Sequence, residues 1–365
     1  MLSDDTFIEI FKHYRLGDVD NWNLRHVWCK LTHVCRRWRL IIRSSTSHLD
    51  VCLRLTNNSL AMDSLGDLPP VPLVIDYWNK TTSRVWQDEE SILAGLRQAG
   101  RVRRVALQAP SLCLRNCLVT MSHEFPVLDD LSLLCTTEGE ETLVLPHTLQ
   151  APNLRHLTLQ GIGFPIELPL FSSTGNTTLI TLTLTRIPPD CYFPPAHLVT
   201  QLQRFPHLEE LSIGFAIPIP LPSAEGELLP APTQHVTLPT LKRLEFRGVS
   251  VYLENLVAQI KAPLLQRLTI TLFFELTFTL FYLNRFVQTT TGLRYLSARV
   301  HFDKVGASLV CSNGESQDSR GLTLNVNCES LDWQIDSATQ ICGALEPTAV
   351  EELTLDLDED GMPSN

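Results

Sequence analysis

Four residues near the N-terminus have side chains of the kind that bind zinc: His26, Cys29, His33 and Cys35. On a helix, the first three would share one face, whereas Cys35 would point elsewhere. A structural zinc site surrounds the ion tetrahedrally, and one helix rarely does so. We therefore predict no metal site here and interpret Cys35 as part of an apolar stripe.

No other arrangement of residues predicts catalysis. Cys113 and Cys117 are four residues apart, which fits small core residues better than a redox pair. No nucleophile elbow or catalytic triad is recognisable, and neither a GxGxxG nor a GxxxxGK(S/T) sequence occurs. The sequence thus predicts a non-catalytic protein that uses no cofactor. An enzyme would need a strongly perturbed carboxylate or histidine in a deep pocket.

Composition narrows the choice of partner and compartment. The chain has 365 residues and a formal net charge of -11, which argues against nucleic acid because its binding proteins are usually basic. The most apolar stretch, Leu268 to Leu283, is too short and too polar to span a membrane. No signal peptide is recognisable at the N-terminus, and the ten cysteines follow no disulfide spacing. We expect a cytoplasmic or nuclear protein with no membrane partner.

Two amphipathic segments open the chain. In the first, apolar residues recur at helical spacing from Leu2 to Phe11, and Ser3 stands where an N-cap belongs. The second runs from Trp28 to Ile42 and predicts a basic helix over Lys30 to Arg43. A unit of this size cannot readily bury a core of its own. We expect it to share its apolar face with a partner, and its basic residues to favour an acidic one.

These segments carry a family resemblance. The matching residues are Leu2-x-Asp4-Asp5-x-Phe7-Ile8-x-Ile10-Phe11, followed by Val34-Cys35-Arg36-Arg37-Trp38-Arg39-x-Ile41. The pattern resembles the F-box, the helical motif that docks substrate receptors onto the adaptor of Skp–cullin–F-box ubiquitin ligases. The family usually has proline after the first leucine, where this chain has Ser3. The resemblance implies a three-helix F-box that binds a Skp-type adaptor and, through it, a cullin. It implies that the adaptor-binding residues come from Leu2, Phe7, Ile10, Phe11, Leu31, Val34, Cys35 and Trp38, with Trp38 as the main anchor and some of the others packing internally.

The rest of the chain repeats the pattern L-x-x-L-x-(apolar). Clear copies occur at 128–133, 154–159, 179–184, 208–213, 241–246 and 265–270, and weaker ones at 102–107, 293–298, 328–333 and 350–355. The sixth residues of these copies are 107, 133, 159, 184, 213, 246, 270, 298, 333 and 355, so the gaps run from 22 to 35 residues. The alternating part of each copy predicts a short strand with one buried face. This looks like an irregular leucine-rich repeat, which implies a solenoid with a parallel sheet on one face.

The pattern suggests a domain organisation. We expect an F-box at 1–48, an entry cap or linker region at 49–101, irregular leucine-rich repeats at 102–358 and an acidic tail at 359–365. The entry region contains apolar runs at 51–55 and 71–77 and a predicted helix at 88–98. Two interruptions, at 217–236 and 303–321, are expected to be loops on one rim.

Outward strand positions, which alternate with the buried leucines, offer a binding face. We expect Arg243, Arg247, Arg267 and Arg299 on adjacent middle strands, with Tyr295 beside them. Because arginine captures carboxylate and phosphate groups with two hydrogen bonds, these five residues are a hypothetical binding site for an acidic or phosphorylated segment of a target protein. The alternative is a set of solvated charges balanced by acidic neighbours.

The sequence therefore predicts an α/β protein, with a helical F-box followed by a leucine-rich-repeat-like solenoid. The predicted function is that of the substrate-recognition subunit of a Skp–cullin–F-box ubiquitin ligase, which binds an unknown protein target. The alternative is a non-catalytic repeat scaffold that has no role in ubiquitin transfer.

Overall fold

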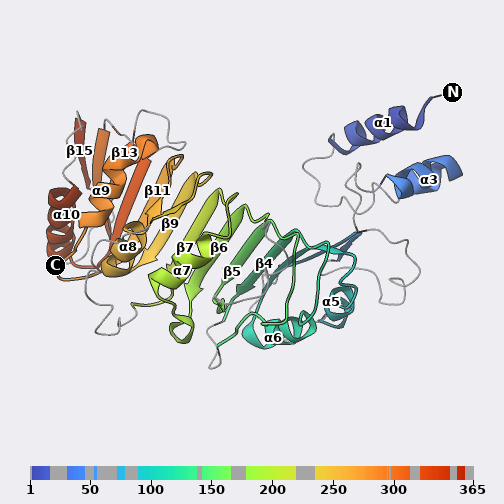
Figure 1. Cartoon of the computed structure of the whole chain (residues 1–365), viewed down its shortest axis with the longest axis horizontal. Helices are drawn as coiled ribbons and strands as arrows, with labels where there is room; N and C mark the ends of the chain where they lie inside the picture. The colour runs from blue at the N-terminus through green and yellow to red at the C-terminus, as the bar shows by residue number, and fades with distance from the viewer. Residues whose placement is uncertain are drawn as a thin grey trace. The chain divides into compact units, whose positions relative to one another are not determined.

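The computed structural model describes residues 2–16, 31–45, 53–55, 72–78, 89–137, 142–165, 178–218, 235–293, 295, 297–312, 321–345 and 352–357. The chain divides into two compact units. Unit 1 comprises residues 1–137 and 146–154, and unit 2 comprises residues 138–145 and 155–365. Each unit combines helices with strands that are mostly parallel, so the predicted α/β class is confirmed (Figure 1).

Unit 1 begins with two helices, α1 (Asp4–Leu16) and α3 (Arg36–Ser44). The predicted N-cap of α1 is confirmed, because the hydroxyl oxygen of Ser3 accepts a hydrogen bond from the backbone N–H of Thr6 at 3.2 Å. The two helices pack against each other and enclose a small apolar core.

The continuous basic helix expected over Lys30 to Arg43 is interrupted at Cys35. Residues 31–34 form a helical turn, but the backbone of Cys35 is extended, with φ -156° and ψ 167°. The Cys35 sulfur accepts a hydrogen bond from the N–H of Trp38 at 3.4 Å, so this residue caps α3 instead of belonging to an apolar stripe. A helical turn and a separate helix therefore replace one long amphipathic helix.

The remainder of unit 1 contains a parallel sheet. Its strands follow chain order, β1 (Leu53–Leu55), β2 (Leu73–Trp78), β3 (Val102–Ala109) and β4 (Asp130–Cys135). The two apolar runs of the expected entry region are thus the first strands of this sheet. Two helices, α5 (Glu89–Leu96) and α6 (Ser111–Thr120), contact each other beside it, and α5 confirms the helix predicted at 88–98.

Unit 2 continues the same pattern with longer regularity. Parallel neighbours in sheet order are β5 (His156–Gln160), β6 (Thr181–Ile187), β7 (Glu210–Phe215), β9 (Arg243–Gly248) and β11 (Arg267–Phe273). Two short strands, β8 (Val236–Thr237) and β10 (Ile260–Lys261), pair separately. The connections carry η3 (Pro189–Cys191), α7 (Pro195–Leu202), α8 (Ser250–Val257), α9 (Phe281–Thr289) and η4 (Thr291–Leu293).

The repeated leucines align across these strands. Leu157, Leu182, Leu211, Leu244 and Leu268 are paired from strand to strand, and each is at most 1% exposed. The intervening positions are half-buried or exposed, as expected for a sheet with one covered face. The covering layer is a row of helices, because α7 contacts α8 and α8 contacts α9 (Figure 1).

The end of unit 2 departs from the predicted order. β12 (Ser297–Phe302), β13 (Gly306–Ser312) and β14 (Gly321–Asn327) form an antiparallel meander, and β14 rather than β12 lies beside β11. The loop predicted at 303–321 is wrong, because it contains β13. The weak repeat copy at 328–333 is also wrong, because it leads into α10 (Leu331–Leu345), which packs on β12 and β13.

The last strand, β15 (Glu352–Leu357), pairs in parallel with β12 and corresponds to the final weak copy of the repeat. Most of the other predicted loop, at 217–236, lies outside the described residues, as does the predicted acidic tail at 359–365.

Candidate functional site

The helical pair at the start of unit 1 separates the predicted adaptor-binding residues into two groups. Phe11 and Leu31 are 1% and 8% exposed and form a core with Ile41 and Ile42. Trp38, expected to be the main anchor, packs with this core, its ring 5.0 Å from that of Phe11. Phe7 also packs against the core. These positions hold the two helices together.

The second group faces outward. Leu2, Ile10 and Val34 are 52%, 45% and 59% exposed, and Cys35 is exposed as well. The structure adds Leu40, which is 60% exposed and which the sequence reasoning missed. The sequence did hint at this exposure, because Leu40 does not belong to the apolar positions Trp38, Ile41 and Ile42 that pack in the core. We call the exposed apolar residues Leu2, Ile10, Val34 and Leu40 the docking face.

Arg37 fixes the start of α1 against α3. Its Nη2 atom donates hydrogen bonds to Asp4 Oδ1 and to the backbone oxygen of Leu2, both at 2.7 Å. Its guanidinium carbon also lies 5.0 Å from the centre of the Phe7 ring. The contacts hold the backbone of Leu2, a member of the docking face, in place. Arg36 and Arg43 remain exposed on α3 and give its outer side a positive charge.

A second candidate surface is the outward face of the unit 2 sheet. Arg243 on β9 is the register partner of Arg267 on β11, which confirms that these two arginines are neighbours. Arg243 also forms an ion pair with Glu210 at 3.1 Å, and the guanidinium of Arg247 lies 5.7 Å from the ring centre of Phe273. Arginines and their acidic partners therefore share this part of the face.

Two members of the predicted target site lie elsewhere. Arg299 is on β12, separated from β11 by β14 and β13, so it does not adjoin Arg267. Tyr295 is only 8% exposed, and burial raises the pKa of its hydroxyl to about 12. The expected placement of Arg299 and Tyr295 beside the other three residues is therefore wrong; Arg243 and Arg267 are neighbours, and Arg247 lies four residues further along β9.

Glycines flank this arginine group. Gly214 on β7 is the register partner of Arg247, and Gly321 on β14 is the partner of Arg267. Gly214 is buried, and a Cβ at Gly321 would meet the backbone oxygen of Cys311, so neither glycine opens a space beside its arginine.

The remaining reactive side chains are dispersed or buried. Within the described residues, no three His, Cys, Asp or Glu side chains are grouped so that they could hold a metal ion. His26 and Cys29 lie outside the described part of the chain. The predicted core placement of Cys113 and Cys117 is confirmed, and burial raises the pKa of Cys117 to about 12, which suppresses thiolate chemistry.

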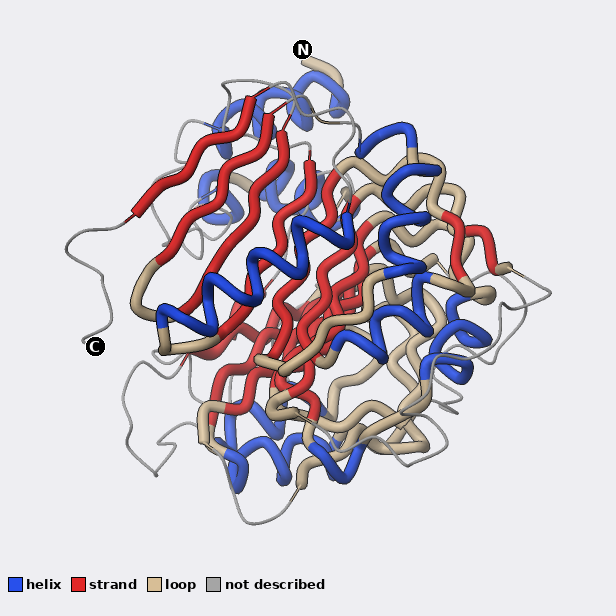
Figure 2. Tube along the Cα trace, turned by 90° about the vertical axis from the view of Figure 1, so that its left-hand side faces the viewer, coloured by secondary structure: helices blue, strands red, loops and turns tan. Residues whose placement is uncertain are grey.

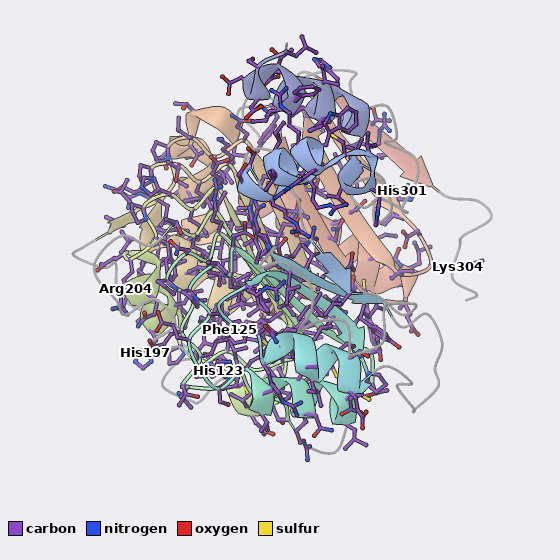
Figure 3. The ribbon with its side chains drawn as sticks, turned by 90° about the vertical axis from the view of Figure 1, so that its right-hand side faces the viewer. His123, Phe125, His197, Arg204, His301 and Lys304 are labelled. Atoms are coloured by element: carbon purple, nitrogen blue, oxygen red, sulfur yellow. The ribbon has the colours of Figure 1, made fainter. Side chains whose placement is uncertain are left out.

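Four other basic side chains of unit 2 lie in two separate places. His197 lies on α7 and Arg204 just after it, whereas His301 lies on β12 and Lys304 in the turn after it; Figure 3 shows the two pairs well apart. In unit 1, His123 stacks on Phe125, with ring centres 4.9 Å apart.

Comparisons with known proteins give no further guide to function. No family model, curated protein or solved structure matches the chain. In the part of the chain that the structure describes, no helix has the length and apolar character needed to cross a membrane.

Proposed function

We propose that this protein is the substrate-recognition subunit of a Skp–cullin–F-box ubiquitin ligase. In this role, residues 1–48 act as an F-box that binds a Skp-type adaptor, and the repeats form a leucine-rich-repeat-like solenoid that binds a target protein. The protein performs no chemistry itself. It raises the effective concentration of the target near the ubiquitin-loaded enzyme.

The observation that carries the proposal is the docking face. A helical pair with a small core of its own leaves Leu2, Ile10, Val34 and Leu40 exposed, which is a large number of exposed apolar side chains for so small a unit and favours a protein partner that covers them. The sequence of the same unit resembles the F-box. Ser3 supports the resemblance despite replacing proline, because it caps α1 and so defines the start of the helix.

The regular part of unit 2 supports the solenoid. From β5 to β11 the repeated strands are parallel, and one leucine of each repeat copy stays in register with the next. Each connection returns the chain to the same end of the sheet, which is how stacked repeats build a continuous core. For the target, we propose that Arg243, Arg247 and Arg267 accept an acidic or phosphorylated segment.

The test is a pull-down of the full chain with a Skp-type adaptor. Trp38→Ala is a poor probe, because removing a core aromatic side chain destabilises the helical pair itself. A double variant, Ile10→Ser with Val34→Ser, changes exposed residues only and should lose adaptor binding. Leu112→Ser is the matched control, because Leu112 is 65% exposed on α6, outside the docking face.

Adaptor binding that survives the double variant would refute the docking face as the contact. If the folded wild-type chain did not bind the adaptor, the receptor role would fall and the scaffold role would replace it. A second arm uses Arg243→Glu with Arg267→Glu. This variant should keep the adaptor and lose the target proteins that accumulate on the wild-type chain when the cullin is inactive.

A further inference from the structure

An apolar surface lies on one flank of α10 in unit 2. Leu276, in the loop after β11, is 81% exposed. Phe274, two residues earlier, stacks on Trp333 of α10, which is 51% exposed, with ring centres 4.8 Å apart and an interplanar angle of 16°. We call Phe274, Leu276 and Trp333 the α10 flank. Single exposed apolar residues are ordinary on protein surfaces, but an exposed leucine two residues from a partner of an exposed, stacked tryptophan is the residue chemistry of an interface.

The loop that carries Leu276 is held on both sides. Gln340 of α10 donates a hydrogen bond to the backbone oxygen of Leu276 at 3.2 Å and accepts one from the N–H of Phe278 at 3.0 Å. The preceding residue, Glu275, accepts hydrogen bonds from the N–H and the hydroxyl of Ser250 at 2.6 and 2.7 Å. The exposed leucine is therefore preorganised, which lowers the entropy lost when a partner covers it.

The exposed charges on α10 itself and just before it are acidic, and the exposed Lys304 lies in the turn whose Asp303 oxygen accepts a hydrogen bond from Gln334. The outer side of α10 carries Asp332 and Asp336, and the helix contains no lysine or arginine. Glu329, just before the helix, is also exposed. Figure 2 shows α10 in front of the sheet, with its outer side toward the viewer and no other described helix or strand in front of it. The charge and position of these carboxylates favour a basic partner.

We propose that the α10 flank docks a basic amphipathic helix of another protein. A helix fits because Gln340 already engages backbone groups of the loop at Leu276 and Phe278, so recognition relies on side chains. Leucine-type residues three and four apart on the partner cover Leu276 and Trp333, while its lysines or arginines meet Asp332 and Asp336. This contact is separate from the adaptor and target contacts of the proposed function.

The acidic charge also argues against other occupants. A second copy of this chain carries a net charge of -11 and would be repelled, and an anionic membrane surface or nucleic acid would be repelled for the same reason. Because the α10 flank is separate from the adaptor and target contacts, the proposal does not depend on whether the protein is a ubiquitin-ligase receptor.

The test measures fluorescence anisotropy with a labelled synthetic helix of about four turns, with leucines on one face and lysines elsewhere. A matched peptide replaces every lysine with glutamate. The full chain should bind the lysine peptide, bind the glutamate peptide at least about tenfold more weakly, and lose affinity as salt is raised.

Leu276→Ser and Trp333→Ser should each weaken binding at least about tenfold. Asp332→Asn with Asp336→Asn should weaken it and reduce its dependence on salt. The charge-matched control, Glu90→Gln with Glu124→Gln, alters exposed carboxylates of unit 1 and should bind like the wild type. Thermal unfolding checks that each variant is folded. Leu276→Ser guards against a folding defect, because its side chain is almost fully exposed.

Unchanged affinity in folded Leu276→Ser and Trp333→Ser would mean that the peptide binds the overall negative charge, and the proposal would be overturned. Failure of the wild-type chain to bind, or equal binding of both peptides, would overturn it as well.

Discussion

Glu254 is a buried carboxylate that begins a neighbouring helix. It lies on α8, is fully buried, and accepts hydrogen bonds from the N–H groups of Tyr282 and Leu283 at 2.6 and 2.8 Å. These amides belong to the first turn of α9, whose own N-cap residue, Leu280, has no side chain that can cap. Glu254 thus supplies the cap from an adjacent helix. We consider the variant Glu254→Gln, which keeps the shape of the side chain and removes its ionisable carboxyl group.

The contribution of Glu254 to the free energy of unfolding depends on pH. Desolvation raises the pKa of Glu254 to about 7, although the two backbone hydrogen bonds oppose the rise. In the folded chain the carboxyl therefore keeps a proton that the unfolded chain has already lost. The stability it contributes is greatest below its unfolded pKa, near 4.5, and falls as the pH rises through about 7. From about pH 5 to about pH 8 the wild type should lose roughly 2 to 3 kcal/mol.

The glutamine variant should behave differently at the two ends of this range. Its amide oxygen can accept one N–H, but its NH₂ group faces the other, which leaves one buried donor unpaired at a cost of about 1–3 kcal/mol. Glu254→Gln should therefore be less stable than the wild type near pH 5, and the difference should shrink or vanish near pH 8.

Urea unfolding followed by circular dichroism across this pH range measures the effect, with Glu124→Gln as an exposed control. Hydrogen exchange at Tyr282 and Leu283 reports the cap directly. If the unfolding midpoints of wild type and Glu254→Gln ran parallel across the range, Glu254 would not titrate there and the reasoning would be refuted.

Two further predictions concern single residues of the structure. Gly321 has a φ of +153°, and a Cβ there would collide with the backbone oxygen of Cys311, so Gly321→Ala should destabilise unit 2 by about 1–3 kcal/mol. A Cβ at Gly343 on α10 would meet no atom, so Gly343→Ala should instead stabilise unit 2 by about 0.5–1 kcal/mol. Melting temperatures of the two variants check this contrast. Lys242→Ala removes an ion pair with Glu209 in which both side chains are more than two-fifths exposed, so urea unfolding should show a change within about 1 kcal/mol.

The parallel strands could be predicted because their signal is local. In copies such as Leu154 to Leu159 and Leu179 to Leu184, the alternating leucines fix which face is buried. The spacing between copies then sets which strands can be neighbours. Register follows, because a shift by one residue would turn every leucine outward.

The division of the docking face from its core could not be predicted in the same way. Ile10 and Phe11 are adjacent, apolar and both part of the motif, yet one is 45% exposed and the other 1%. Which of them is buried depends on how α1 meets α3, and that angle depends on the break at Cys35 and the Arg37 contacts. A residue pattern read along one helix does not contain this information.

The error at β13 has a specific cause. Residues 303–321 are rich in serine, glycine and charge, which favoured a loop, but Ala307, Leu309 and Cys311 alternate with more exposed neighbours and are buried. Two of these three residues, Ala307 and Cys311, are small, so the hydrophobic signal of the alternation is weak beside the turn-forming residues around it. Burial against α10 supplies the stabilisation that the local sequence does not indicate.

The same meander decides which arginines can act together. Reasoning from chain order assumes that the next repeat copy forms the next strand, which would place Arg299 beside Arg267. Instead, β14 and β13 lie between them, and at about 4.8 Å per strand β12 is roughly 14 Å from β11. Arg299 is therefore not a strand neighbour of Arg267, whereas Arg243 is its direct register partner. An acidic ligand bound between neighbouring strands is expected at Arg243 and Arg267, with Arg247 four residues further along β9.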